Sequence, residues 1–377
     1  MKKDEKLTSW EWKSLVNPGS LADGHAHQGQ NASQRRVINR LSSIFFDAEK
    51  ANQLQLQNDF EKLFFHLGGQ KAYKKFSKPL YHYACSLCIE VVANYLRTNN
   101  TSVSLVHPTF DNLADILKRH KVKLEPISES ELLDIAQNKH KIRTQALFLV
   151  CPNNPTGLEL TKKQFSNIVD YCKKNNKLLI LDFSFRFFSK HIEWDQYEIL
   201  HSSGVDFIAL EDTGKVWPTL DLKIGLMISN NSLYEDMVSI TDDFILNLSP
   251  FIIQLLTEYL QVEKIKSRSI KTAQVIKKNK KILIDRLRKT PLRVMNPGSP
   301  MSVAWIRLPK TWESTTFCEW LEKNNIYVLP GGPFFWNDAK QGDSFLRIAL
   351  SRPEKLFSII TKRLEIATLK YKNETPI

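Results

Sequence analysis

The chain has 377 residues, of which 42% are hydrophobic and 25% charged, with a formal net charge of +13. The length is sufficient for two domains with sizeable cores, and the composition is that of a soluble globular protein. No run of about eighteen apolar residues is present, and the start MKKDEKLTSWEWKSL has no apolar core of the kind a signal peptide needs, so we expect a soluble, cytoplasmic protein without a membrane partner.

The cysteines and the positive charge have ordinary explanations. Five scattered cysteines do not form a disulfide framework, and the pair Cys85 and Cys88 has no second ligand pair nearby, so we expect no metal site. The basic excess is concentrated in residues 264–289, where apolar residues recur at helical spacing. We expect a long helix with a solvated basic face there and no nucleic-acid partner, because no aromatic residues are interleaved with the basic ones.

The elements expected at the start of the chain are few. Residues 1–35 carry little periodicity, and we predict a short helix and a loop that form a lid segment. Thr8-Ser9-Trp10-Glu11 fits a capping box, in which the first and fourth side chains bind backbone N–H groups at a helix start.

From about residue 80 to 230, strand-like and helix-like stretches alternate, which predicts a mainly parallel sheet covered by helices on both faces. The expected strands are VSLVHP, ALFLVCP, KLLILD, VDFIAL and IGLMIS, and the expected helices include FDNLADILKRH and KKQFSNIVDYCKKN. The stretch 264–289 would lead into a smaller α+β unit with SVAWIRL, FCEWLEKNN, IYVLPG and FLRIAL. We therefore predict an α/β protein with a lid segment at 1–35, a large domain at 36–270 and a small domain at 271–377.

Three residues follow predicted strands and indicate a pyridoxal phosphate (PLP) site. Lys215 could form a Schiff base with an aldehyde cofactor. Asp182, which closes the apolar run LLILD, could keep a pyridine nitrogen protonated. Asn154, in CPNNPTG, could stabilise the cofactor's phenolic oxygen at the sheet edge where ligands bind. Each residue alone has a simpler interpretation as a solvated lysine, a helix cap or a turn residue, and the prediction depends on their combination.

With these residues the chain resembles fold-type-I PLP enzymes of aminotransferase class I/II, and the match covers most of its length. The resemblance places the family's Asn-Pro-Thr-Gly at 154–157, its pyridine-binding aspartate at Asp182 and its Schiff-base lysine at Lys215. It also implies that Arg347 clamps the substrate α-carboxylate, for which a bidentate guanidinium is suited. Phe110 falls where the family stacks an aromatic ring on the cofactor.

The phosphate-binding positions depart from that family. Asp212 and Lys223 stand where common aminotransferases have a serine and an arginine that grip the cofactor phosphate. Lys223 could still neutralise a phosphate, whereas Asp212 would repel it. Ser86 at a helix start, and Ser184 or Thr213, could supply hydroxyl groups instead.

A second departure concerns the cofactor ring and the reaction. Phe185 replaces the tyrosine that usually donates to the phenolic oxygen, which puts ordinary transamination in doubt. The blocks LADGHAHQ, VHPTFDNLADIL, SFRFF and EDTGKVWPTLDLK closely resemble the PLP-dependent L-arginine oxidases, which include the arginine hydroxylase of the enduracididine pathway of secondary metabolism. These enzymes use dioxygen and release ammonia and peroxide, with a 2-oxo-arginine product that some of them hydroxylate at C4.

The resemblance assigns further roles. Asp212 and Glu11 would hold the substrate guanidinium, which leaves Glu11 with two interpretations, because it also closes the predicted capping box. His25 would act as a base late in the reaction, and His27 stands where related enzymes carry arginine. The expected partners are L-arginine, dioxygen and a second copy of the chain in a homodimer. The alternatives are an aminotransferase for arginine or another cationic amino acid, and a PLP-binding regulator without turnover.

Overall fold

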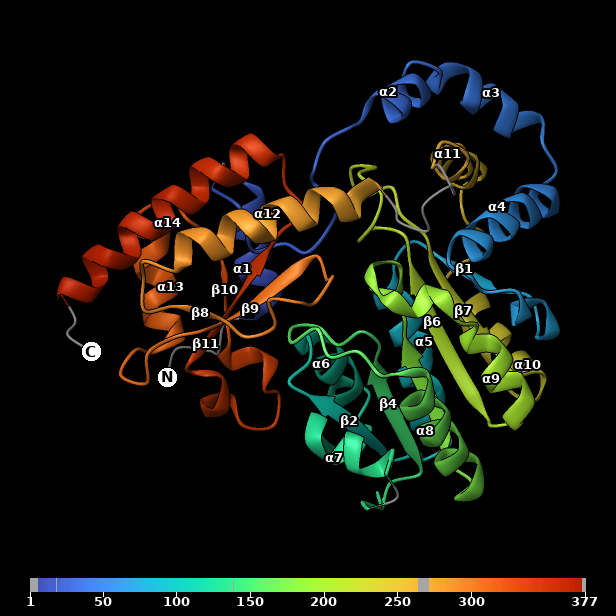
Figure 1. Cartoon of the computed structure of the whole chain (residues 1–377). Coiled ribbons are helices and arrows are strands. Elements are labelled where there is room, and N and C mark those ends of the chain that lie inside the picture. The colour runs from blue at the N-terminus through green and yellow to red at the C-terminus, as the bar shows by residue number, and fades with distance from the viewer. Residues whose placement is uncertain (1–5, 18, 138, 264–270, 375–377) are drawn as a thin grey trace.

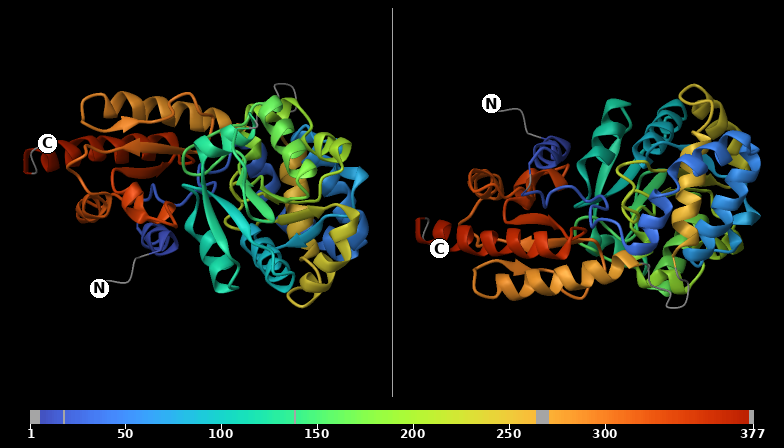
Figure 2. Two further views of the ribbon diagram at one scale, coloured as in Figure 1. Left: turned by 90° about the horizontal axis from the view of Figure 1, so that it is seen from below. Right: turned by 90° about the horizontal axis from the view of Figure 1, so that it is seen from above.

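The computed structural model describes residues 6–17, 19–137, 139–263 and 271–374. Two lobes lie side by side, a larger one built on a seven-stranded mixed sheet and a smaller one built on a four-stranded antiparallel sheet (Figure 1, Figure 2). The α/β fold with a mainly parallel sheet and a smaller α+β unit is thereby confirmed. The domain boundaries at residues 35 and 270 stay a prediction.

The large sheet has the strand order β1-β7-β6-β5-β4-β2-β3. Its strands are β1 (Leu80–His82), β2 (Val103–His107), β3 (Leu124–Ser128), β4 (Ala146–Val150), β5 (Leu178–Asp182), β6 (Phe207–Asp212) and β7 (Gly225–Ser229). The adjacent strands β3, β2, β4, β5 and β6 are parallel to one another. Strand β7 runs antiparallel to both of its neighbours, β6 and β1. The apolar runs predicted as strands are β2, β4, β5, β6 and β7, whose residues are almost all buried because helices cover both faces.

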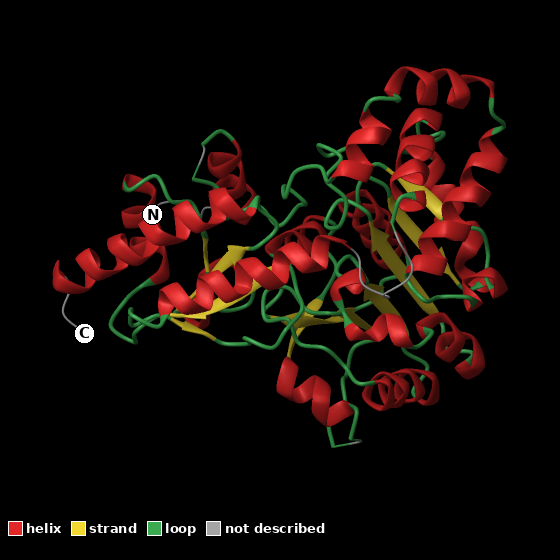
Figure 3. Cartoon of the chain, turned by 45° about the horizontal axis from the view of Figure 1, so that its top comes forward, coloured by secondary structure: helices red, strands yellow, loops and turns green. Residues whose placement is uncertain are grey.

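Helices pack on both faces of this sheet (Figure 3). On one face α5 packs against β6, β7, α6 and α10, while α8 and α9 pack together on the other. These helices are α5 (Cys85–Thr98), α6 (Asp111–Arg119), α7 (Glu129–Ile135), α8 (Lys162–Lys174), α9 (Gln196–Ser203) and α10 (Asn231–Asp242). A capping box of Thr161 and Gln164 begins α8, which explains why the predicted helix starts there.

A layer of four helices, three of them from the first part of the chain, covers one end of the large lobe. It consists of α2 (Ala32–Ile38), α3 (Leu41–Lys50), α4 (Gln53–Leu67) and α11 (Pro250–Gln261), and α11 packs against the other three. Short 3-10 helices connect the elements of both lobes: η1 (Ala72–Lys75), η2 (Arg186–Phe188), η3 (Lys190–Glu193), η5 (Gly332–Phe334) and η6 (Ala339–Gly342). No helix in the described part of the chain is long and apolar enough to cross a membrane.

The small lobe has the strand order β10-β11-β9-β8. Its elements are α12 (Lys271–Leu287), β8 (Arg293–Val294), β9 (Val303–Arg307), α13 (Ser314–Lys323), β10 (Leu329–Pro330), β11 (Phe345–Ala349) and α14 (Glu354–Glu374). The predicted basic helix is α12, although residues 264–270 lie outside the described residues. Lys277 and Lys278 are exposed as expected, but Lys280 is buried and donates to the Ser299 carbonyl oxygen, so the basic face is not fully solvated.

The N-terminal segment crosses from one lobe to the other. Helix α1 (Leu7–Leu15) packs against β10 of the small lobe and against α6 of the large lobe. The predicted capping box is wrong, because Lys6 is the N-cap and makes no side-chain cap bond. The Asp111 carboxylate accepts the Leu7 N–H at 2.8 Å instead, so a distant residue supplies the cap.

Candidate active site

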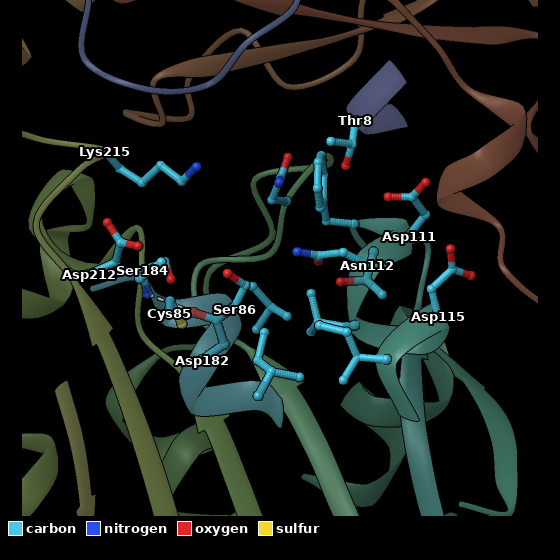
Figure 4. A pocket seen from close by; sticks show the side chains of 18 of the residues that line it. Thr8, Cys85, Ser86, Asp111, Asn112, Asp115, Asp182, Ser184, Asp212 and Lys215 are labelled. Carbon is cyan, nitrogen blue, oxygen red and sulfur yellow. Dashed lines mark hydrogen bonds between the residues drawn. The ribbon is translucent and has the colours of Figure 1, made fainter. Parts of the chain in front are cut away.

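A cavity of about 510 Å³ opens at the carboxyl edge of the large sheet, beneath α1 (Figure 4). Strand order reverses between β4 and β2, so the loops after these two strands leave in opposite directions and form a crevice, as ligand sites in open α/β sheets do. The cavity lining includes all twelve predicted site residues: Glu11, His25, Ser86, Phe110, Asn154, Asp182, Ser184, Phe185, Asp212, Lys215, Lys223 and Arg347. Thr213 is outside the lining, since its hydroxyl accepts the Ile224 N–H at 2.8 Å.

The floor of the cavity carries two buried carboxylates at the ends of adjacent strands. Asp182 ends β5 and accepts the Ser184 N–H at 2.8 Å, and Asp212 ends β6 and accepts the Gly214 N–H at 2.5 Å. Burial raises the pKa of Asp182, and the charge of Asp212 raises it further, although hydrogen bonds from Ser184 and the charge of Lys215 lower it. A desolvated carboxylate of this kind favours a cationic partner, and a protonated pyridine nitrogen would fit.

Two lysines meet His25 above this floor. Its Nε2 lies 3.3 Å from Lys215 Nζ and 3.1 Å from Lys223 Nζ. Lys215 Nζ is also 6.0 Å from the centroid of the Phe185 ring, so one side of this amine faces an apolar surface. Figure 4 shows the Lys215 side chain extending into the cavity above Asp212 and Ser184. The arrangement leaves an amine and an imidazole nitrogen close enough to exchange a proton.

The Asp23 carboxylate binds the Nδ1 side of the His25 ring. One carboxylate oxygen lies 2.6 Å from His25 Nδ1, and the other contacts His27 Nε2. Burial raises the pKa of Asp23, but the hydrogen bonds from the two histidines outweigh it and keep that pKa well below its usual range. Because an ionised carboxylate only accepts hydrogen bonds, His25 Nδ1 carries a proton and its Nε2 is directed at the lysines.

Arg347 also lines the cavity and is buried. Its guanidinium donates to Asn154 Oδ1 at 3.2 Å, to Glu11 Oε1 at 3.1 Å and to the Ala22 carbonyl oxygen at 2.5 Å. The Phe110 ring centroid is 5.5 Å from its Cζ. Burial lowers the pKa of Arg347, while the charges of Glu11 and Asp23 raise it. An arginine so placed beside Asn154 can receive a carboxylate from a ligand in the cavity.

These residues fit the chemical groups of PLP. The N-terminus of α5 faces the cavity through Cys85 and Ser86, and its N-cap provides no side-chain bond, so its free N–H groups and the hydroxyls of Ser86 and Ser184 can receive a phosphate. Lys223 adds a positive charge. In the part of the chain that the structure describes, no group of three His, Cys, Asp or Glu side chains is placed to hold a metal ion.

Two residues at this site, Asp23 and Asp111, have no role in the prediction made from the sequence. Asp23 lies two residues before His25 and four before His27, and a carboxylate at that spacing from two histidines was a local signal. Asp111 lines the cavity directly after Phe110, and it received no role because nothing local reveals that it contacts α1.

Sequence comparisons relate the chain to aminotransferases. A family model described as aminotransferase class I and II matches residues 52–363. The chloroplastic LL-diaminopimelate aminotransferase of Arabidopsis thaliana is 25% identical over 217 residues, which cover 55% of this chain and 45% of that protein. Histidinol-phosphate aminotransferase of Buchnera aphidicola subsp. Cinara cedri is 26% identical over 214 residues, with coverages of 53% and 56%. The chain thus spans about half the length of the curated relatives it matches.

Solved structures cover more of the chain. The structure of MppP soaked with the product 2-ketoarginine is similar with a TM-score of 0.85 and 28% identity, and the match covers 92% of this chain and 99% of that chain. An aminotransferase from Mycobacterium tuberculosis has a TM-score of 0.77 at 14% identity, with coverages of 97% and 96%, which is a likeness of fold alone.

Proposed function

Because the chain belongs to the aminotransferase class I and II family, which implies PLP, we propose that it is a PLP- and dioxygen-dependent oxidase of L-arginine. The products would be 2-oxo-arginine or 4-hydroxy-2-oxo-arginine, with release of ammonia and hydrogen peroxide. The main support for this proposal is that two sets of side chains line one cavity. One set suits the cofactor, namely Lys215, Asp182 and Asn154, and the other suits a cationic amino acid, namely Arg347, Glu11 and Asp212. The likeness to the structure of MppP soaked with the product 2-ketoarginine supports arginine as the substrate.

When bound, the cofactor would supply an electron-withdrawing ring that acidifies the substrate α-carbon. Asp182 would hold the pyridine nitrogen and Asn154 the phenolic oxygen, while Phe110 and Phe185 would border the ring. Ser86, Ser184 and the α5 N-terminus would hold the phosphate with Lys223.

The substrate would be held at both ends. Arg347 would bind the α-carboxylate, because its guanidinium is buried beside Asn154. Asp212 and Glu11 would face the guanidinium with opposite charge. The α1 helix lies over the cavity and would limit the access of bulk water during turnover.

Proton transfers would fall to Lys215 and His25. Lys215 would remove the α-proton as general base. His25 Nε2, 3.3 Å from that amine, would accept or return a proton, with Asp23 fixing the ring through Nδ1. In hydroxylation the same imidazole would activate the water that attacks C4.

Oxygen uptake by the purified holoenzyme tests this proposal. With L-arginine and no 2-oxo acid, we expect dioxygen consumption with release of ammonia and peroxide, and mass spectrometry of the product distinguishes simple deamination from hydroxylation. The alternative is an aminotransferase for arginine or another cationic amino acid, which the matches to LL-diaminopimelate aminotransferases favour. Turnover that strictly requires an added 2-oxo acid would exclude the oxidase and support that alternative.

We also infer a homodimer. Phe45 and Phe46 of α3 are 51% and 56% exposed, and the Phe45 ring lies 5.7 Å from Phe251 of α11. Half-exposed aromatic side chains that gather on one helix pair are typical of a protein interface. The family resemblance supports a second copy of this chain as the occupant.

A further inference from the structure

The neighbouring strands β2 and β4 separate at the carboxyl edge of the large sheet, beside the cavity. Their last register pair is Leu105 with Phe148, two residues before the end of each strand. The turn after β2 carries Phe110 and the turn after β4 carries Asn154, and both residues line the cavity. The spacing of these two residues therefore depends on contacts other than the backbone ladder between the strands.

The Asn153 side chain bridges the two strand ends. It is buried, and its amide nitrogen donates to the Pro108 carbonyl oxygen at 2.9 Å and to Glu129 Oε1 at 2.6 Å. Pro108 lies in the turn after β2, and Glu129 is the first residue of α7, after β3. An amide nitrogen carries two N–H groups, and these two acceptors use both.

The Glu129 carboxylate receives a second hydrogen bond from the turn after β4. Its Oε1 also accepts from the Thr156 hydroxyl, so one oxygen binds side chains on both sides of Asn154 in the chain. Strands β2 and β3 stay in register to their last residues, His107 opposite Ser128, so the backbone that leads into Glu129 is fixed to β2. Glu129 thus connects the turn after β4 to an ordered part of the sheet.

These connecting side chains act at a distance from any ligand. Glu129, Asn153 and Thr156 are outside the cavity lining, whereas Asn154 belongs to it. Asn154 Oδ1 accepts from Arg347 at 3.2 Å, which leaves the amide N–H groups of Asn154 as donors for a ligand. A change at Glu129 can therefore reach a bound molecule only through the turn.

We propose that Glu129 is a positioning residue that acts through the turn 153–157 and holds the Asn154 amide against the phenolic oxygen of bound PLP. This inference rests on the proposed function, which assigns that oxygen to Asn154. A donor stabilises the negative charge of the phenolic oxygen, and the proton on the nearby Schiff-base nitrogen at Lys215 is then held less tightly. Displacement of Asn154 should raise the pH at which this nitrogen loses its proton.

The test is a pH titration of the holoprotein without substrate, followed by the absorbance of the cofactor, so the result does not depend on turnover. We expect Asn154→Ala to raise the titration midpoint by about one pH unit and Glu129→Ala to raise it by about half a unit or more. Loss of a negative charge by itself would lower the midpoint, because a nearby anion stabilises the protonated nitrogen. The direction of the shift therefore separates lost positioning from lost charge.

Two variants of the hydrogen-bonded group refine the test. Glu129→Gln retains an oxygen that can accept from both Asn153 and Thr156, so its midpoint should stay near the wild-type value. Thr156→Val removes one of the two hydrogen bonds and should raise the midpoint by less than Glu129→Ala does. It also provides a second measurement should Glu129→Ala be poorly folded.

A neighbouring carboxylate of α7 supplies the matched control. Glu131 completes the capping box with Ser128 and is not a partner of the turn 153–157 in the described structure. Glu131→Ala should lower the melting temperature, because the helix loses its cap, and should leave the midpoint of the titration unchanged.

The double variant Glu129→Ala, Asn154→Ala tests the path of the effect. If Glu129 acts through Asn154, the midpoint of the double variant equals that of Asn154→Ala alone. A raised midpoint in Glu129→Ala that Glu129→Gln restores supports the inference. An unchanged or lowered midpoint in Glu129→Ala, an equal rise in Glu131→Ala, or additive shifts in the double variant overturns it.

The same titration separates this inference from the proposed function. An unchanged midpoint in Asn154→Ala overturns both the inference and the role proposed for Asn154. Absence of oxygen uptake with L-arginine would count against the proposed oxidase alone, because the titration uses neither arginine nor turnover.

Discussion

Lys215 is the residue on which the proposed chemistry depends. Its amine reaches the cavity beside His25 and the Phe185 ring, whereas most lysines of the chain are directed at solvent. We expect Lys215→Ala to abolish covalent attachment of PLP and to reduce turnover on the order of 10³-fold or more. Borohydride reduction followed by peptide mapping measures the attachment. Lys281→Ala, on the exposed face of α12, should retain it, and a label at any other lysine would refute the assignment.

A second residue-scale prediction concerns the buried ion pair beneath the site. Arg186 and Glu211 are fully buried and 2.8 Å apart, and Tyr197 donates to the same carboxylate at 3.0 Å. Glu211→Leu would leave the guanidinium unpaired in the core, and we expect the free energy of unfolding to fall by about 3–5 kcal/mol. Urea denaturation measures this change. The double variant Arg186→Met, Glu211→Leu should recover much of it, and an equal loss in both proteins would contradict the explanation.

At the scale of elements, helix α5 packs tightly on the strand that precedes it. The His82 ring, at the end of β1, is buried 3.4 Å from the Sγ of Cys88 on α5 and 3.4 Å from the hydroxyl of Thr241 on α10. Burial lowers the pKa of His82 to about 4. The folded protein therefore binds this proton more weakly than the unfolded chain does.

This difference predicts a loss of stability in acid. The contribution of His82 is complete above a pH of about 6.5 and is lost as the pH falls toward 4, by up to about 3 kcal/mol. Unfolding measured between pH 7 and 4 should show a weaker pH dependence for His82→Gln than for the wild type. His66→Gln, at an exposed position of α4, should leave the dependence unchanged. Identical curves for all three proteins would disprove the prediction.

At the scale of the whole molecule, the N-terminal segment joins the two lobes and closes the site. Leu21 donates to the Tyr327 carbonyl oxygen at 2.8 Å and accepts from the Ala349 N–H at 2.7 Å, which adds the segment to the small lobe. The Asp111 bond to Leu7 attaches α1 to the large lobe. His25 and Glu11, which belong to this attached segment, line the cavity.

The proposed homodimer is tested at this scale. Phe46→Asp places a charge on the exposed aromatic face of α3, and we expect it to convert the dimer to a monomer, as measured by light scattering after size-exclusion chromatography. Ile359→Asp alters an exposed position of α14 in the small lobe and should leave the dimer intact. A monomeric wild-type protein would contradict the proposal.

The sequence by itself determined the fold class and predicted residues that line one cavity. Buried parallel strands require continuous apolar runs, and the residues after such strands reach one edge of the sheet. The sequence alone therefore predicted that Asn154, Asp182 and Lys215 lie close together. Only the tertiary structure decided which groups share hydrogen bonds. The Leu7 cap comes from Asp111, 104 positions away, and no local pattern encodes such a contact. For the same reason the capping box was wrong, and Glu11 lies against Arg347 because folding brings α1 to β11.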